Sequence, residues 1–143
     1  MPLTFAVEIV SADHKVYSGQ SVSLIMPGVD GYFGVLSGHA PLIAALGIGM
    51  ITLQPPGGEL PILFAVAGGF AEVTQDQVTV LAETAEQAQE IDVERARLAA
   101  ERARTRLAEA AGKRETTDID RARAALMRAL NRLRVAEYRQ MGR

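Results

Sequence analysis

The last third of the chain carries charged residues whose types and spacing could bind a phosphate group. Asp92 and Arg95 are three residues apart and Arg102 follows two helical turns later, so a helix would place all three on one face. Arg128 and Arg132, four residues apart, would share a face in the same way. Arginine binds phosphate through paired hydrogen bonds, and a carboxylate accepts one from an amino or hydroxyl group. The alternative is a solvated face of weak ion pairs, and the residues alone favour that alternative.

Catalytic and metal-binding patterns are weak throughout the sequence. Ser37 and His39 place a hydroxyl near an imidazole, but in a glycine-flanked turn local hydrogen bonding is the better interpretation, and no third triad member is evident. There is no phosphate-binding loop, zinc-protease helix or nucleophile elbow. The chain has no cysteine and two histidines, of which His14 fits a solvated turn. These observations disfavour an enzyme, a thiolate metal site and a histidine-rich metal site.

The segment from Gly34 to Leu42 does not fit a generic loop. It places two glycines, a proline and His39 between apolar residues that do not alternate. A shaped loop with few charges can serve as a docking surface. A tight corner of a β-structure, with His39 bonded to the backbone, explains the same residues equally well.

Composition divides the 143-residue chain into two parts, although the net charge is only −2. Up to Thr84 there is one base against seven acids, and from Ala85 there are fourteen bases against ten acids. All six prolines lie at or before Pro61, and every arginine lies at or after Arg95. The basic excess is too small for a nucleic-acid protein, and no apolar run is long enough to span a membrane. No targeting segment is recognisable at the start, so we expect a cytoplasmic protein.

The first part has the residue pattern of β-strands. Apolar residues alternate in short runs rich in β-branched and aromatic types, and turn residues separate the runs, notably Pro27-Gly28, Pro55–Gly58 and Gly68-Gly69. The pattern predicts a small antiparallel sandwich or barrel. The expected strands are Phe5–Val10, Val16–Ile25, Gly49–Leu53, Leu60–Val66, Phe70–Val73 and Gln77–Leu81.

The second part has the pattern of two helices. No proline or glycine occurs from Glu86 to Ala111, Gly112 suits the end of a helix, and Thr117 or Asp118 can cap a second one. Apolar residues recur every three or four positions in both segments. We therefore expect an antiparallel hairpin whose arginines converge near its open end. The predicted stripes are Ala96, Ala99, Ala103, Leu107 and Ala110, and Ile119, Ala122, Leu126, Ala129, Leu133 and Ala136. Because alanine buries little area, the hairpin should be weakly held.

Several motifs, in order along nearly the whole chain, resemble the epsilon subunit of rotary F-type ATP synthases. They are the segments Phe5–Ser11, Val16–Gly19, Pro27–Leu42, Ala67–Val73, Val78–Ala85 and Leu133–Glu137. The resemblance implies an α+β protein with an N-terminal antiparallel β-sandwich of about ten strands and a C-terminal antiparallel two-helix hairpin. It places the domains at residues 1–85 and 86–143, with a hinge near Glu83 to Ala88.

The resemblance also implies a function and partners. The sandwich would join the gamma subunit to the c-subunit ring in the central stalk, as a non-catalytic, peripheral subunit at the cytoplasmic face of the cell membrane. The hairpin would be a regulatory arm that blocks ATP hydrolysis when it extends to the catalytic alpha–beta hexamer. No cofactor or metal is required, and ATP is a candidate regulatory ligand. The alternative is a protein that serves primarily as an ATP-binding sensor.

Matching the family motifs residue by residue gives two candidate sites. The docking residues are Asp30, Gly31, Tyr32, Ser37, Gly38, His39, Ala40, Pro41 and Leu42. Some members carry an acidic residue where this chain has Tyr32, so Asp30 is the candidate replacement for a contact with the c ring. The segment Ile91–Ala96 resembles the motif by which certain bacterial members bind ATP. The candidate ATP-binding residues are Glu86, Asp92, Arg95, Arg102, Arg128 and Arg132.

Overall fold

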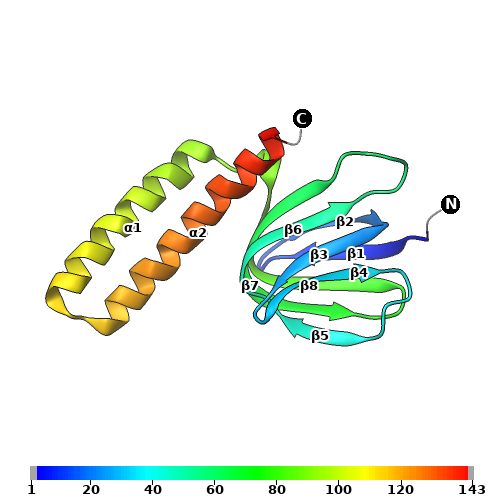
Figure 1. Cartoon of the computed structure of the whole chain (residues 1–143), viewed down its shortest axis with the longest axis horizontal. Helices are drawn as coiled ribbons and strands as arrows, with labels where there is room; N and C mark the ends of the chain where they lie inside the picture. Colours follow the sequence, from blue (N-terminus) through cyan, green and yellow to red (C-terminus); the bar gives the residue numbers. More distant parts are fainter. Residues whose placement is uncertain (1–2, 142–143) are drawn as a thin grey trace. The chain divides into compact units, whose positions relative to one another are not determined.

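The computed structural model describes residues 3–141, which form two compact units that meet at Ala88 and Gln89. Each unit is described by itself. Figure 1 shows the strands of the first unit and the two antiparallel helices of the second. The strands are β1 (Phe5–Val10), β2 (Lys15–Ser21), β3 (Ser23–Gly28), β4 (Gly31–Leu36), β5 (Leu42–Ala45), β6 (Ile48–Gln54), β7 (Ile62–Val73) and β8 (Gln77–Gln87). A 3₁₀ turn (Ala88–Glu90) precedes α1 (Val93–Lys113) and α2 (Thr116–Met141).

The strands follow the order β2-β1-β8-β7-β6-β3-β4, and β5 pairs with β7 outside that path. The first half of β7 pairs with β6, whereas its second half pairs with β5. All neighbours are antiparallel except β1 and β8, which are parallel. The long strands β7 and β8 therefore take part in both layers of a sandwich, so the expected sandwich is confirmed and one parallel pairing is added to it.

The core lies between the two layers and consists of large apolar side chains. Ile9 from β1, Leu24 from β3, Ile51 and Leu53 from β6 and Phe64 from β7 have no exposed surface. In β1 and β6 the buried residues alternate with half-buried ones, because successive side chains point to opposite faces. Burial of several large side chains is enough to hold a sandwich of this size.

Gly68-Gly69 does not end a strand, contrary to the sequence prediction. β7 runs through both glycines and keeps one register with β8 on either side of them. The glycines adopt φ of +70° and +106°, which bends the strand from one layer into the other. A Cβ on Gly69 would lie 2.0 Å from the carbonyl oxygen of Leu81, so only glycine fits there. The described residues thus contain eight strands rather than about ten, because β7 and β8 each serve as two.

Two other turns differ from the prediction. The segment Val16–Ile25 is not one strand, because the chain turns at Val22 and the Ser21 hydroxyl donates to the carbonyl oxygen of Gln54 at 3.1 Å. Pro27-Gly28 ends β3 rather than forming the turn, which falls on Val29 and Asp30. Proline is tolerated there because the local hydrogen bond does not need a main-chain N–H at Pro27. The carbonyl oxygen of Pro27 instead accepts from the main-chain N–H of Gly47 at 2.9 Å.

The hairpin is confirmed, but its helices begin and end at other residues than predicted. Glu86 and Gln87 pair with β7, so α1 begins only after Asp92, whose side chain caps it. Gly112 is helical, and Arg114 takes the left-handed position at φ 56°. The predicted hinge from Glu83 to Ala88 is mostly strand, and the segment between the last strand and the first helix is Ala88–Asp92.

The two helices pack through small residues. The predicted stripe of α2 is buried or half-buried along its whole length, and in α1 the buried positions are all alanine. Ala100, which the prediction omitted, is among the most deeply buried residues of α1. Small side chains let the helix axes approach closely but bury little apolar area per residue. The two helices therefore lie close together, but their interface buries little apolar area.

Candidate functional site

The predicted docking segment is not one loop. Asp30 lies in the exposed turn before β4, Gly31 and Tyr32 begin that strand, and Leu42 begins β5. The six residues of β4 separate Asp30 from Ser37 by about 20 Å of extended chain. The structure thus places the acidic turn at one end of the sandwich and the segment Ser37–Pro41 at the other, so a single partner side chain cannot contact both.

Tyr32 has a structural contact that the sequence did not indicate. Its hydroxyl accepts a hydrogen bond from the main-chain N–H of Met50 at 2.9 Å. A Cβ on Gly49 would lie 2.5 Å from the Tyr32 hydroxyl, so the glycine allows the ring to lie across β6. The side chain is still 60% exposed. Tyr32 therefore joins β4 to β6 while most of its side chain stays exposed.

The segment Ser37–Pro41 is a corner held by main-chain bonds. The N–H of Gly38 donates to the carbonyl oxygen of Gln75 at 3.1 Å, and that of His39 donates to Leu36 at 3.1 Å. The Nδ1 of His39 lies 2.7 Å from the carbonyl oxygen of Ala40 and donates to it. His39 is thus bonded to the backbone, as one of the two interpretations proposed. Gly38 and Ala40, together with Pro41, are exposed.

His14 lies in the exposed turn between β1 and β2, as the sequence suggested. Its Nδ1 is 2.7 Å from Asp13 Oδ1 and 3.1 Å from the Ser11 hydroxyl. The hydrogen bond with His14 lowers the pKa of Asp13. One ring nitrogen contacts both side chains, so this serine, histidine and aspartate do not have the sequential arrangement of a catalytic triad.

An exposed apolar patch on the outer face of the sandwich was missed by the sequence analysis. Phe70 and Leu81 are directly opposite each other on β7 and β8, and Ala45 pairs with Phe70 from β5. Ile43 lies two residues from Ala45 on the same face. Ile43, Phe70 and Leu81 are 72%, 57% and 56% exposed. We call these three residues the outer patch, and adjoining large apolar side chains of this exposure are typical of a protein interface.

The candidate ATP residues lie in both units. Asp92, Arg95 and Arg102 belong to the start and middle of α1, and Arg128 and Arg132 belong to α2. Glu86 is in β8, opposite Ala65. Five of the six residues thus belong to the hairpin, and Glu86 belongs to the other unit.

Asp92 has a defined local role. Its Oδ1 accepts the main-chain N–H of Arg95 at 3.0 Å and so caps α1. This cap bond uses only the main chain of Arg95. The aspartate and arginine of the motif are therefore joined through the helix start rather than through a side-chain ion pair in the described structure.

On another face of α1, the charged side chains already pair with one another. Arg97 forms ion pairs with Glu94, one turn before it, and with Glu101 at 2.6 Å, one turn after it. Arg97 lowers the pKa of Glu94 through its hydrogen bonds. Because these charges satisfy one another, this face is a poor candidate for a charged ligand.

Arg102 and Arg128 lie at similar heights along the hairpin. Ala110 and Ala122 line one cavity, so they mark a common level of the two helices. Arg102 precedes Ala110 by eight residues and Arg128 follows Ala122 by six, which leaves a height difference of about 3 Å at 1.5 Å per residue.

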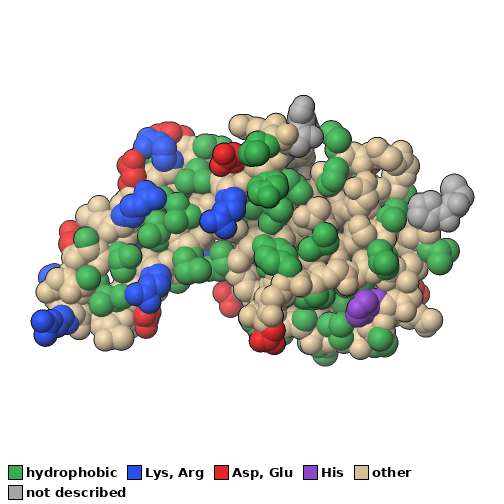
Figure 2. Space-filling model, in the orientation of Figure 1, with side chains coloured by type: hydrophobic (Ala, Val, Ile, Leu, Met, Phe, Trp, Pro, Cys, Tyr) green, Lys and Arg blue, Asp and Glu red, His purple; other side chains and the backbone are tan. Residues whose placement is uncertain are grey.

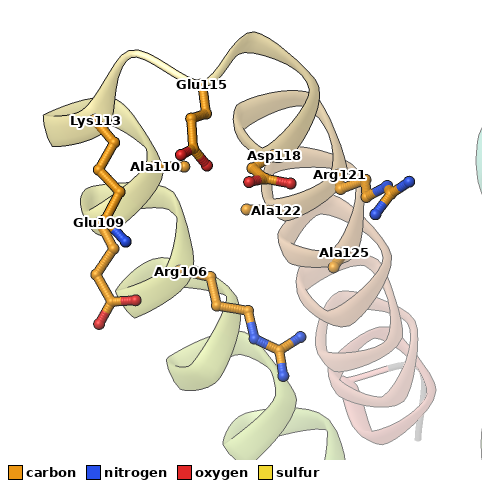
Figure 3. Close-up of a pocket in the computed structure, with 9 residues that line it drawn as sticks. All are labelled: Arg106, Glu109, Ala110, Lys113, Glu115, Asp118, Arg121, Ala122 and Ala125. Atoms are coloured by element: carbon orange, nitrogen blue, oxygen red, sulfur yellow. The ribbon is translucent and has the colours of Figure 1, made fainter.

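A cavity of about 330 Å³ lies at the closed end of the hairpin (Figure 3). Alanines form its floor, and Figure 3 shows the carboxyl groups of Glu115 and Asp118 near each other between the helices. A hydrogen bond with Asp118 raises the pKa of Glu115. The lining residues are Arg106, Glu109, Ala110, Lys113, Glu115, Asp118, Arg121, Ala122 and Ala125. The sequence analysis did not identify this cavity.

Comparison with protein families assigns both units. The ATP synthase, Delta/Epsilon chain, beta-sandwich domain matches residues 4–88, and the long alpha-helix domain of the same chain matches residues 89–137. The protein is therefore a member of the ATP synthase delta/epsilon family.

Bacterial relatives agree with this assignment. The ATP synthase epsilon chain of Koribacter versatilis is 50% identical over 105 residues, which cover 72% of this chain and 71% of that protein. The epsilon chain of Lawsonia intracellularis is 44% identical over 106 residues, covering 74% and 78%. The epsilon chain of Halalkalibacterium halodurans is 48% identical over 103 residues, covering 72% and 76%.

A solved structure supports the fold. A chain in the Euglena gracilis mitochondrial ATP synthase, solved with OSCP, F1 and the c-ring, has a TM-score of 0.74 at 22% identity. The match covers 89% of this chain and 78% of that one. Within residues 3–141, neither helix contains a stretch long and apolar enough to cross a membrane.

Proposed function

We propose that this chain is a non-catalytic central-stalk subunit of a proton-translocating ATP synthase, where its sandwich joins the gamma subunit to the c-subunit ring. Membership of the delta/epsilon family supports the proposal. The observation that carries the docking role is the outer patch, because three neighbouring large apolar side chains stay exposed on an otherwise well-packed sandwich. The complex would lie at the cytoplasmic face of the cell membrane, with this chain as a peripheral subunit.

Two features of the sandwich suit different contacts. The outer patch is apolar and continues toward the segment Ser37–Leu42, which suits the gamma subunit. Asp30 is exposed in the turn that follows Val29, and its charge suits a basic loop of the c ring. This turn lies beside the outer patch, because the main-chain N–H of Val29 donates to the carbonyl oxygen of Ala45 at 3.0 Å and Ala45 pairs with Phe70.

Mutation of the outer patch tests this role. Phe70→Ser with Leu81→Ser should abolish copurification of the chain with the gamma subunit. Leu60→Ser is the matched control, because Leu60 is 60% exposed in the loop before β7. Equal binding by the patch variant and the control would refute the docking role. For the c ring, Asp30→Ala should weaken binding most at low salt, where exposed charges are least screened.

The hairpin is proposed to be a regulatory arm. Extended, it would contact the catalytic alpha–beta hexamer transiently and inhibit ATP hydrolysis. The alanine interface supports this, because it buries little apolar area. The free energies of the folded and extended arrangements of such a hairpin need differ by only a few kcal/mol. Its basic excess would suit acidic loops of the hexamer. The test is ATP hydrolysis by the assembled complex with the full chain and with a chain ending at Ala88. Unchanged hydrolysis would refute an inhibitory arm.

A second candidate function is an ATP sensor. Arg102 and Arg128 lie at similar heights along the hairpin, and Arg95 and Arg132 lie further along the same helices toward its open end. Glu86, in β8 of the other unit, stays a predicted ligand. Bound ATP would hold the hairpin in its folded form, with no metal ligand from this chain required. Calorimetric titration of the isolated chain with ATP should show binding that Arg128→Ala removes. The absence of heat at millimolar ATP would refute the sensor.

A further inference from the structure

Eight cations of the hairpin are arranged in two rows with the same spacing. In α1 they are Arg95, Arg102, Arg106 and Lys113, and in α2 they are Arg121, Arg128, Arg132 and Arg139. Both rows step by seven, four and seven residues, so each lies along one face of its helix. We call these eight residues the basic strip. Each row spans about 27 Å, because eighteen residues of helix rise 1.5 Å each.

Both rows lie on the same side of the hairpin. Arg106 and Lys113 from α1 line the same cavity as Arg121 from α2 (Figure 3), which fixes the two rows to a common face. Helical periodicity then carries the remaining cations along that face. Figure 2 shows Lys and Arg side chains distributed along the helical unit. Five of the eight strip residues are exposed and Arg128, Arg132 and Arg139 are half-buried.

The cations of the strip outnumber the acids on the same face of the hairpin. The carboxylates on the same face are Asp92, Glu109, Glu115 and Asp118, against eight cations. Within residues 3–141, Arg106, Lys113 and Arg121 form no ion pair within 4.0 Å, although acids line the same cavity. By contrast, Arg97 on the other face holds two glutamates. The charges of Arg106, Lys113 and Arg121 are thus available to a ligand from outside.

The strip is longer than one nucleotide requires, and we propose that it binds a linear phosphate polymer, inorganic polyphosphate being the simplest. Such a chain would run between the two rows from the arginines shared with the proposed ATP site to the cavity at the closed end. Guanidinium groups bind phosphate through paired hydrogen bonds, and seven of the eight cations are arginine.

The floor of the strip favours a thin polyanion over a protein segment. Between the rows lie small side chains, including Ala110, Ala122 and Ala125 in the cavity. Protein interfaces obtain most of their energy from large apolar or aromatic anchors in pockets, and the cavity offers none. A phosphate chain needs only charge and a narrow groove. An acidic protein segment is therefore the competing occupant that the experiment must separate.

The test is titration of the full chain with tripolyphosphate, with longer polyphosphates and with ATP, at several salt concentrations. Affinity should rise with polymer length until the polymer spans the strip. Arg106→Gln with Arg121→Gln should weaken binding of the long polymer about tenfold and lower its salt slope by about 1 for each lost phosphate contact. The same variant should leave ATP binding unchanged.

The matched control is Arg104→Gln with Arg123→Gln, which removes the same charge from exposed positions off the strip. Equal weakening by the control, or affinity independent of length, would overturn the proposal. So would equal affinity for polyglutamate of the same charge, since that result identifies an acidic protein segment instead. Binding of the long polymer without ATP binding would refute the sensor and support the strip. ATP binding without polymer binding would do the opposite.

Discussion

The cores of the two units of this protein consist of different kinds of side chain. The sandwich buries Phe, Ile, Leu and Met completely, whereas the buried positions of α1 are alanines. Apolar stabilisation scales with buried area, so each core residue of the sandwich contributes several times more than each alanine of the hairpin. The difference predicts that the sandwich is the more rigid unit and that the hairpin opens at a lower cost in free energy.

The largest effect should follow from a cavity in the sandwich. Leu53→Ala removes a side chain with no exposed surface and should destabilise the sandwich by about 2–5 kcal/mol. Leu107→Ala, at a half-buried position of α1, should cost about 1 kcal/mol or less. Urea denaturation with hydrogen exchange to assign each unit measures both. Equal losses of unfolding free energy would contradict the difference between the two cores.

The bend in β7 is the next test, because it joins the two layers. Gly69→Ala should cost roughly 1–3 kcal/mol from its φ of +106°, and the collision with Leu81 adds to that. Gly47→Ala is the control, since its added Cβ meets nothing within 4 Å. Thermal unfolding of the two variants distinguishes them, and a tolerated Gly69→Ala would show that the bend does not need glycine.

The close helix packing predicts sensitivity to larger residues. Ala103 is 2% exposed, so Ala103→Leu should separate the helices at a cost of about 1–3 kcal/mol. Hydrogen exchange should accelerate across α1 and α2 and stay unchanged in β7 and β8. Ala108→Leu, at an exposed position, should leave exchange unchanged. Acceleration in the sandwich as well would show that the two units are not independent.

The start of α1 separates a structural role from a ligand role. Asp92→Ala should cost about 1 kcal/mol of helix stability, because the main-chain N–H of Arg95 loses its acceptor. Asp92→Asn keeps a capping oxygen and removes the charge, so it should restore the helix signal in circular dichroism. If Asn restores the helix but not ATP affinity, the carboxylate charge serves the ligand.

The smallest effect concerns pH. The folded pKa of Glu94 is lowered by Arg97, so its stabilising ion pair is present at neutral pH and is lost as pH falls through that lowered pKa. The folded pKa of Glu115 is raised by Asp118, so its contribution is present at acid pH and is lost as pH rises through the raised pKa. An NMR titration of both glutamates should give pKa values on opposite sides of the ordinary one. Identical values would refute the two local environments.

Local sequence pattern predicted most of the elements but not how they are joined. Alternation located β1 and β6, and helical spacing located the buried stripe of α2. The continuity of β7 could not be predicted, because glycine pairs more often end a strand and only the register with β8 shows that this one bends. The late start of α1 depends on pairing between Glu86 and Ala65, which is a long-range contact.

The candidate sites were predicted less completely than the fold. Motif matching identified Asp92 and the arginines, but the cap that uses Asp92 appears only in three dimensions. The outer patch could not be found from one strand, since Phe70 and Leu81 are eleven residues apart and meet only through pairing. Alternation along β7 would have shown that Phe70 points away from Ala71 and the core. The basic strip was visible as a seven-four-seven spacing, and the cavity supplied the evidence that its two rows face one way.

The continuity of β8 has a mechanical consequence. This strand leads to the hairpin through five residues, Ala88–Asp92, and lies between β7 on one side and β1 on the other. A pull on the hairpin along the strand direction stretches many cross-strand hydrogen bonds at once, in shear, instead of opening them one after another. The same strand that takes part in both layers therefore makes the sandwich resist force transmitted from the hairpin.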